Sequence, residues 1–91
     1  MKPVRWDSGK SEWLRAHRRV GFEEVLLKIE SGDVLDIIEH KNKERYPNQR
    51  MFVLDIDGYA YLVPFVETDT EIFLKAIIPN RKATRNYLGG G

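Results

Sequence analysis

The sequence predicts an α+β domain in which two N-terminal helices pack on an antiparallel sheet of three to four strands, followed by a short C-terminal helix. Residues 51–78 form a long block of strand-favouring residues with apolar side chains at alternate positions. Two earlier segments instead carry apolar residues at helical spacing. A basic segment after Pro79 has Asn80 and Thr84 as candidate helix N-caps.

The first helix is expected over residues 10–19, with Asp7 or Ser8 as its N-cap. One side of this helix is only half apolar, so we expect that side at the margin of the core: Lys10, Trp13, Leu14 and His17. The second helix follows Val20-Gly21 and ends near Gly32. All residues of its stripe are apolar, which predicts a buried helix: Phe22, Val25, Leu26 and Ile29.

Strands are expected at three places along the chain. Residues 4–7 predict a short edge strand, and the apolar, β-branched residues 34–38 predict a strand that joins the sheet. Within residues 51–78, Asp57-Gly58 predicts a tight hairpin because both residues tolerate positive φ. A longer turn is expected near residues 68–70.

Prolines and glycines mark the remaining boundaries. Pro64 lies inside a predicted strand and lacks an N–H, which indicates an edge strand, a bulge or an early strand end. The polar residues 42–49 predict an exposed loop. Residues 1–88 are expected to form one domain, and the glycines at 89–91 to form a disordered tail.

The composition excludes several kinds of site and of partner. The 91 residues include no cysteine, which excludes disulfides, thiolate metal sites and thiol nucleophiles. The two histidines are far apart in sequence, so no zinc site and no cofactor are expected. No apolar run approaches the ~20 residues of a membrane span, and a signal-peptide pattern is absent, so the sequence predicts a cytoplasmic protein without a membrane partner.

The net charge of +1 conceals a segregation of charge along the chain. The net charges are +4 over residues 1–19, −5 over 20–40, +3 over 41–50, −4 over 51–78 and +3 over 79–91. If the fold gathers the basic segments, one face becomes a surface for a polyanion. If the fold interleaves them with the acidic segments, the charges neutralise one another.

The last basic segment is the first candidate site. Arg81 and Arg85 lie one helical turn apart, so two guanidinium groups can hold one phosphate, with Lys82 beside them. This segment contains no acidic residue. The alternative interpretation is a solvated terminal helix with cations near its C-terminal end.

A second candidate cluster lies on a strand end and the loop after it: His40, Glu44, Arg45 and Arg50. Histidine and carboxylate groups are the usual proton carriers, and arginine stabilises the charge that builds on a reacting phosphate. Metal-independent RNA cleavage needs a base, cations and an acid, and this cluster contains all three.

The aromatic residues and the other histidine have simpler interpretations. Tyr59 and Tyr61 either stack on bases or pack against a helix. His17 is expected to be partly buried and hydrogen-bonded to a backbone carbonyl oxygen. Trp6 and Trp13 are expected in the core or in a partner interface.

Several motifs then follow one another in a distinctive order from residue 6 to residue 87: Trp6-Asp7 followed by Lys10, Phe22-Glu23-Glu24, Arg50, and Arg81-Lys82-Ala83-Thr84 followed by Tyr87. In this order the chain resembles the BrnT family of bacterial toxins, small ribonucleases of the RelE/ParE-like superfamily. The resemblance implies a RelE-like fold and a type II toxin that cleaves messenger RNA, on or off the ribosome. It also implies a cognate antitoxin with a ribbon-helix-helix end, through which the pair would contact operator DNA.

The resulting hypothesis is a metal-independent endoribonuclease toxin that inhibits translation. Arg50, Arg81 and Arg85 would hold the scissile phosphate, and His40 or Glu44 would carry the proton. Four further residues would contact or steer the RNA: Lys10, Arg45, Lys82 and Tyr87.

Two alternatives stay open at this point. The first is a catalytically inactive module of the same fold that binds RNA or the antitoxin. The second is a metal-dependent nuclease built on Asp55 and Asp57, although the turn at Asp57-Gly58 explains both residues better.

Overall fold

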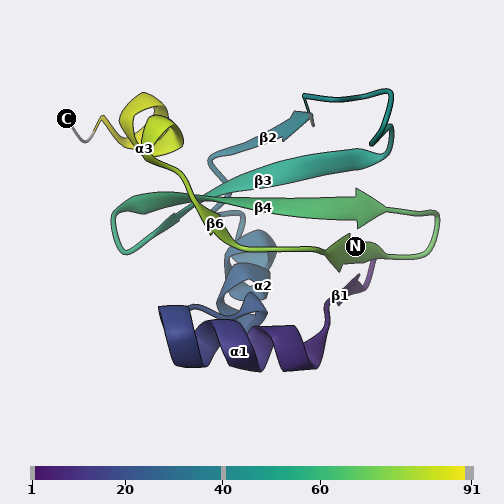
Figure 1. Cartoon of the computed structure of the whole chain (residues 1–91), viewed down its shortest axis with the longest axis horizontal. Coiled ribbons are helices and arrows are strands. Elements are labelled where there is room, and N and C mark those ends of the chain that lie inside the picture. The colour runs from purple at the N-terminus through teal and green to yellow at the C-terminus, as the bar shows by residue number, and fades with distance from the viewer. Residues whose placement is uncertain (1, 40, 90–91) are drawn as a thin grey trace.

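The computed structural model describes residues 2–39 and 41–89 of the chain. The sheet has six strands and is mixed. Figure 1 shows α1 and α2 below this sheet and α3 above it. The strand order is β1-β5-β4-β3-β2, and β6 pairs with β4 beside β5. Along the chain the elements are β1 (Val4–Arg5), α1 (Ser8–Arg18), α2 (Phe22–Ser31), β2 (Asp36–Glu39), β3 (Gln49–Ile56), β4 (Tyr59–Glu67), β5 (Ile72–Leu74), β6 (Ile78–Pro79) and α3 (Arg81–Leu88).

The predicted α+β class and the three helices are confirmed, but the predicted sheet is wrong in two respects. It has six strands rather than three to four, and it is not purely antiparallel, because the edge strand β1 pairs in parallel with β5. The predicted strand ending at residue 78 divides into the two short strands β5 and β6. The predicted strand at 34–38 is confirmed as β2, which pairs with β3.

A bulge separates β5 from β6, and this bulge explains how β4 tolerates Pro64, which has no backbone N–H. Phe65 lies opposite Leu74 while Leu62 lies opposite Ile78, so the β5–β6 side carries one extra residue over this interval. The Pro64 carbonyl oxygen accepts from the Lys75 backbone N–H at 2.8 Å. In a strand, the nitrogen and carbonyl oxygen of one residue point to the same neighbour, so the ring nitrogen faces the irregular segment. Pro64 is therefore in a central strand, and the bulge lies on its neighbour.

The hairpin between β3 and β4 forms as its sequence predicts. Asp57 and Gly58 have φ values of 53° and 85°, and the Asp55 carboxylate accepts from the Gly58 backbone N–H at 2.8 Å. The pairing of β3 with β4 then continues without interruption from Ile56 and Tyr59 to Gln49 and Val66. Asp57 is a turn residue, and Asp55 in β3 stabilises the turn through its side chain.

The helix ends also follow the sequence. Asp7 caps α1 by accepting from the Lys10 backbone N–H at 2.9 Å, and Gly32 ends α2 in the left-handed conformation with φ 78°. Asn80 caps α3 by accepting from the Ala83 backbone N–H at 2.7 Å. Gly89 is the C-cap of α3 in the left-handed conformation, so it belongs to the helix end rather than to the predicted tail, whose other glycines lie outside the described residues.

The buried side of α1 differs from the predicted one. Leu14 is buried as expected, but Trp13 is 51% exposed and His17 is exposed as well. The residue buried beside Leu14 is the polar Ser11. Ser11 lies against the start of α2, and this contact turns α1 so that Trp13 faces away from the core.

A polar junction explains why Ser11 is tolerated in the interior. Its hydroxyl donates to a Glu23 carboxylate oxygen at 2.7 Å and accepts from the Phe22 backbone N–H at 2.9 Å. Arg15 adds ion pairs to Glu23 at 2.8 Å and to Glu24 at 2.7 Å. The hydrogen bond from Ser11, followed by that from Arg15, lowers the pKa of Glu23 below its usual 4.5.

Because the pKa of Glu23 is lower in the folded chain, its carboxylate stabilises the fold above pH 4.5 and loses that effect as the pH falls through the folded-state pKa. We expect Glu23→Gln to reduce the drop in Tm between about pH 6 and about pH 3, measured by circular dichroism. Glu12→Gln, on the exposed side of α1, is the control and should keep the wild-type drop. An identical drop in Glu23→Gln would contradict the role of the junction.

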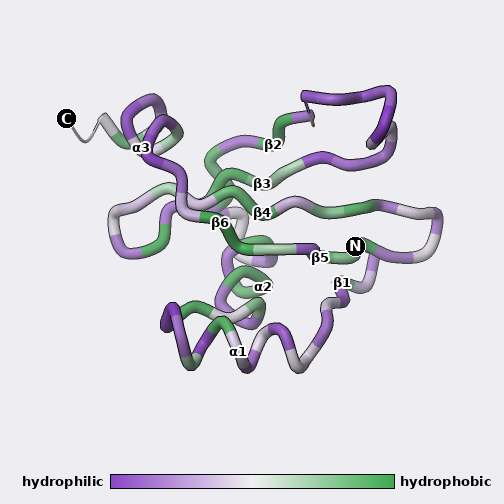
Figure 2. Tube along the Cα trace, in the orientation of Figure 1, coloured by the Kyte–Doolittle hydropathy of each residue, from purple (hydrophilic) through white to green (hydrophobic). Residues whose placement is uncertain are grey.

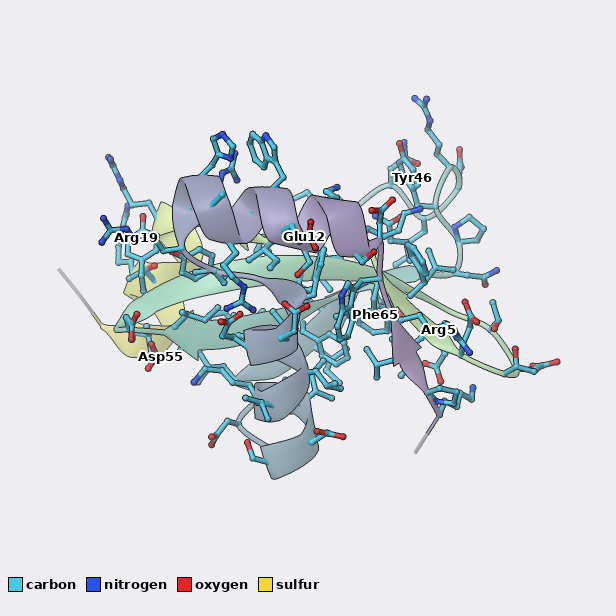
Figure 3. The ribbon with its side chains drawn as sticks, turned by 90° about the horizontal axis from the view of Figure 1, so that it is seen from below. Arg5, Glu12, Arg19, Tyr46, Asp55 and Phe65 are labelled. Atoms are coloured by element: carbon cyan, nitrogen blue, oxygen red, sulfur yellow. The ribbon has the colours of Figure 1, made fainter. Side chains whose placement is uncertain are left out.

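The sheet separates two apolar layers. The main core lies between the sheet and the helices α1 and α2: Leu14, Val20, Phe22, Val25, Phe52, Leu54, Ile56, Val63, Phe65, Leu74 and Ile77. Figure 2 shows hydrophobic stretches along the central strands and on α2. The opposite face carries a small cluster under α3: Val53, Ala60 and Ala83. Figure 3 accordingly shows α1 and α2 in front of the sheet and α3 behind it. No helix within the described ranges is long and apolar enough to span a membrane.

Candidate nucleic-acid interface

The fold interleaves the first two basic segments with the acidic ones. Five cations in residues 2–50 lie within 4.0 Å of a carboxylate: Lys2 with Glu67, Arg5 with Glu71, Arg15 with Glu23 and Glu24, Lys43 with Glu39, and Arg50 with Glu67. The partners of Lys2, Arg5 and Arg50 come from distant parts of the chain, whereas Lys43 and Glu39 are four residues apart. Five of the ten cations in these two segments are thereby paired with carboxylates.

The third basic segment remains unneutralised. Arg81, Lys82 and Arg85 are exposed on α3 and form no ion pair with any residue in 2–39 or 41–89. Arg81 and Arg85 are separated by one helical turn, as predicted. In Figure 2 most of α3 has the purple colour of hydrophilic residues. We call it the α3 cation surface.

The opposite side of α3 is fixed to β4 by hydrogen bonds. The Thr84 hydroxyl accepts from the Ala60 backbone N–H at 2.9 Å and donates to the Asn80 carbonyl oxygen at 2.9 Å. The Asn80 backbone N–H donates to the Ala60 carbonyl oxygen at 3.0 Å. Ala83 packs on Val53 and Ala60. The α3 cation surface is therefore carried by an element that is anchored at its base.

Tyr87 anchors the same helix at its far end. Its hydroxyl donates to an Asp36 carboxylate oxygen on β2 at 2.6 Å, and this bond raises the pKa of the Tyr87 hydroxyl. The side chain is still partly exposed. Tyr87, predicted to contact RNA, thus has a structural contact as well.

Arg50 lies elsewhere, at the opposite end of β3. Its guanidinium lies 5.2 Å from the centroid of the Phe65 ring and pairs with Glu67, which also accepts from Lys2 at 2.8 Å. The hydrogen bond from Lys2 is the main cause that lowers the pKa of Glu67. Arg50, Glu67 and Lys2 line an open hollow of about 570 Å³, together with Glu39, Lys43, Tyr46, Pro47, Asn48, Gln49, Thr68 and Asp69.

Arg50 and the α3 cation surface do not come together. Arg50 shares the sheet face of Phe65 and the main core, whereas α3 packs on the other face. Ala60, where α3 is anchored, lies opposite Asp55, five residues along β3 from Arg50. Five strand residues span about 17 Å. The structure therefore does not bring Arg50 and Arg81 side by side, as the predicted three-arginine site requires.

The other predicted site residues are dispersed. Glu44 and Arg45 lie in the loop before β3. The Arg45 guanidinium carbon lies 5.6 Å from the centroid of the Tyr46 ring, and Tyr46 lines the hollow that Arg50 also lines. His40 lies outside the described residues. The Lys10 ammonium donates to the Lys75 carbonyl oxygen at 2.6 Å, which fastens α1 to the sheet.

The structure shows where the predicted aromatic residues and His17 lie. Trp6 packs against the main core and stacks with Phe22 at 6.1 Å, as expected of a core residue. Tyr61 also packs against that core, while Tyr59 is partly exposed and meets Tyr61 edge to face at 6.0 Å. The hydrogen bond predicted for His17 is present, because its Nδ1 lies 2.9 Å from the Trp13 carbonyl oxygen, but the predicted burial is wrong.

Sequence reasoning missed Glu67, although a signal for it existed. A two-residue turn at Asp57-Gly58 fixes the register of the hairpin, which places Arg50 opposite Phe65 and diagonal to Glu67.

Comparisons of this chain with protein-family models, curated proteins and solved structures found no match.

Proposed function

We propose that this protein is a ribonuclease toxin of a type II toxin–antitoxin module, which cleaves RNA without a metal ion and so inhibits translation. The observation that carries the proposal is the α3 cation surface, where Arg81, Lys82 and Arg85 all lack ionic partners among the described residues. In the other two basic segments, five of the ten cations are paired with carboxylates. A rigid, unneutralised cluster with two arginines one turn apart is suited to a phosphodiester backbone.

The arrangement of elements supports the same proposal. Two N-terminal helices packed on the sheet and a short basic terminal helix agree with the helices that the resemblance implies, although the sheet has six strands and is mixed. We assign this protein a cytoplasmic site of action on messenger RNA. Its partner would be an antitoxin with a ribbon-helix-helix end, which would bring the pair to operator DNA.

In the proposed reaction the RNA supplies its own nucleophile. The 2′-oxygen attacks the adjacent phosphorus, the bond to the 5′-oxygen breaks, and a 2′,3′-cyclic phosphate forms. A base takes the 2′-hydroxyl proton and an acid returns a proton to the 5′-oxygen. Arg81 and Arg85 would hold the phosphate and offset its developing charge. Arg50, with Glu44 and Arg45 near it, would contact a different part of the strand.

Inducible expression in a bacterial host tests this proposal directly. We expect growth arrest, fragmented messenger RNA and rescue by co-expression of the neighbouring reading frame. The purified protein should cleave RNA in the presence of a chelator. Soluble, folded protein that neither arrests growth nor binds RNA would refute the proposal.

A second candidate is a catalytically inactive module of the same fold that binds RNA or the antitoxin. The separation of Arg50 and Glu44 from α3 favours it, because the predicted proton carrier Glu44 does not accompany the α3 arginines. This candidate predicts RNA binding that weakens steeply with salt, normal growth on expression, and intact RNA.

A further inference from the structure

An aromatic stack projects from the exposed side of α1. Trp13 is 51% exposed, and the His17 ring lies parallel to it, with centroids 4.4 Å apart and an interplanar angle of 17°. His17 Nδ1 lies 2.9 Å from the Trp13 carbonyl oxygen, so the imidazole is held in place by its own helix. The Arg18 guanidinium lies 5.9 Å from the centroid of the Trp13 ring.

This stack has no function in the core. The buried side of α1 is formed by Ser11 and Leu14, and Figure 3 shows α1 lying across the sheet with side chains projecting away from it. Trp13 is half exposed and His17 is exposed, so much of the stack is open to solvent, and the Arg18 guanidinium lies over the Trp13 ring. A flat, aromatic group can extend such an exposed stack.

The charges around the stack indicate an anionic ligand. Arg18 and Arg19 are exposed and form no ion pair in the described part of the chain. Arg15, by contrast, is turned toward α2 and paired with Glu23 and Glu24. The large exposed aliphatic side chains lie on other elements, namely α2, β2 with the residue before it, and β6: Leu27, Leu35, Ile37 and Ile78. The rim of the stack is therefore cationic rather than apolar.

We propose that Trp13 and His17 form a stacking platform for unpaired nucleobases of single-stranded RNA, with Arg18 and Arg19 placed to contact the flanking phosphates. Aromatic platforms flanked by cations bind single strands in this way, because every base has a π-face. The choice of RNA rests on the proposed function. The platform is a separate contact region, on the sheet face opposite the α3 cation surface.

The test measures affinity for a fluorescent single-stranded oligoadenylate by anisotropy over a series of salt concentrations. Trp13→Ala should weaken binding about tenfold without changing the slope of log affinity against log salt, since stacking releases no counterions. Trp13→Phe should recover part of the loss. Arg81→Ala with Arg85→Ala should instead reduce the slope by about 1.4, from about 0.7 for each phosphate contact in a single strand.

Leu27→Ala is the matched control, because Leu27 is also strongly exposed on a helix but has no stacked ring or cation. It should bind like the wild type. A duplex of the same sequence should be insensitive to Trp13→Ala, because its bases are already stacked. Wild-type affinity in folded Trp13→Ala would overturn the platform while leaving the proposed function intact if the arginine variant loses binding. A change in sedimentation with unchanged RNA affinity would also overturn it, in favour of a protein interface.

Discussion

Replacing Phe22 by alanine is expected to lower the free energy of unfolding by about 3–5 kcal/mol. Phe22 is fully buried at the start of α2, stacks with Trp6, and donates its backbone N–H to the buried Ser11 hydroxyl. The truncation leaves a cavity where α1, α2 and the sheet meet. A domain of this size has a total stability of about 5–15 kcal/mol, so the variant should be partly or largely unfolded at 37 °C.

Urea denaturation followed by circular dichroism measures this loss. Leu27→Ala is the control, because Leu27 lies on the same helix and is 66% exposed. Its substitution should change the free energy of unfolding by less than about 0.5 kcal/mol. Similar losses in the two variants would mean that α2 does not pack on the sheet through Phe22.

The local features of this fold could be predicted because the physics behind them is local. Asp57-Gly58 specifies a hairpin through positive φ, and Asp7, Gly32 and Asn80 specify helix ends through hydrogen bonds to neighbouring backbone groups. Each signal lies within a few residues of the structure that it determines. The structure confirms all four.

The features that could not be predicted depend on contacts between distant segments. The parallel pairing of β1 with β5 joins residues 4–5 to residues 72–73 and makes the sheet mixed. The exposed side of α1 depends on Ser11 meeting Phe22 and Glu23, and a polar residue gives no hydropathy signal for burial. The bulge opposite Pro64 lies on a different strand from the proline that indicates it.

Some residues of the candidate site could also be predicted from the sequence, and others could not. The cations of α3 could be found from sequence, because a segment without acids has no local partner to neutralise it. Whether distant acids neutralise the other basic segments depends on the fold, and Glu67 does so for both Lys2 and Arg50. The grouping of Arg50 with Arg81 failed because hydropathy does not tell which sheet face α3 covers.

Replacing both Arg81 and Arg85 by alanine is expected to abolish growth inhibition and to weaken RNA binding at least tenfold, because each arginine can make charge-assisted hydrogen bonds to phosphate. The fold should persist, since both side chains are exposed without ionic partners among the described residues, and alanine favours helix. Anisotropy with labelled RNA, growth after induction and circular dichroism give the three readouts.

The matched control removes the same two charges from positions that the fold neutralises. Arg5→Ala with Lys43→Ala gives the same net charge as the α3 variant, but Arg5 pairs with Glu71 and Lys43 with Glu39. If RNA binds at the α3 cation surface, this control should keep most of its affinity and its toxicity. If both double variants lose affinity equally, binding follows net charge alone, and α3 is not the RNA-binding element. Because the two variants share one net charge, only the position of the cations can separate them.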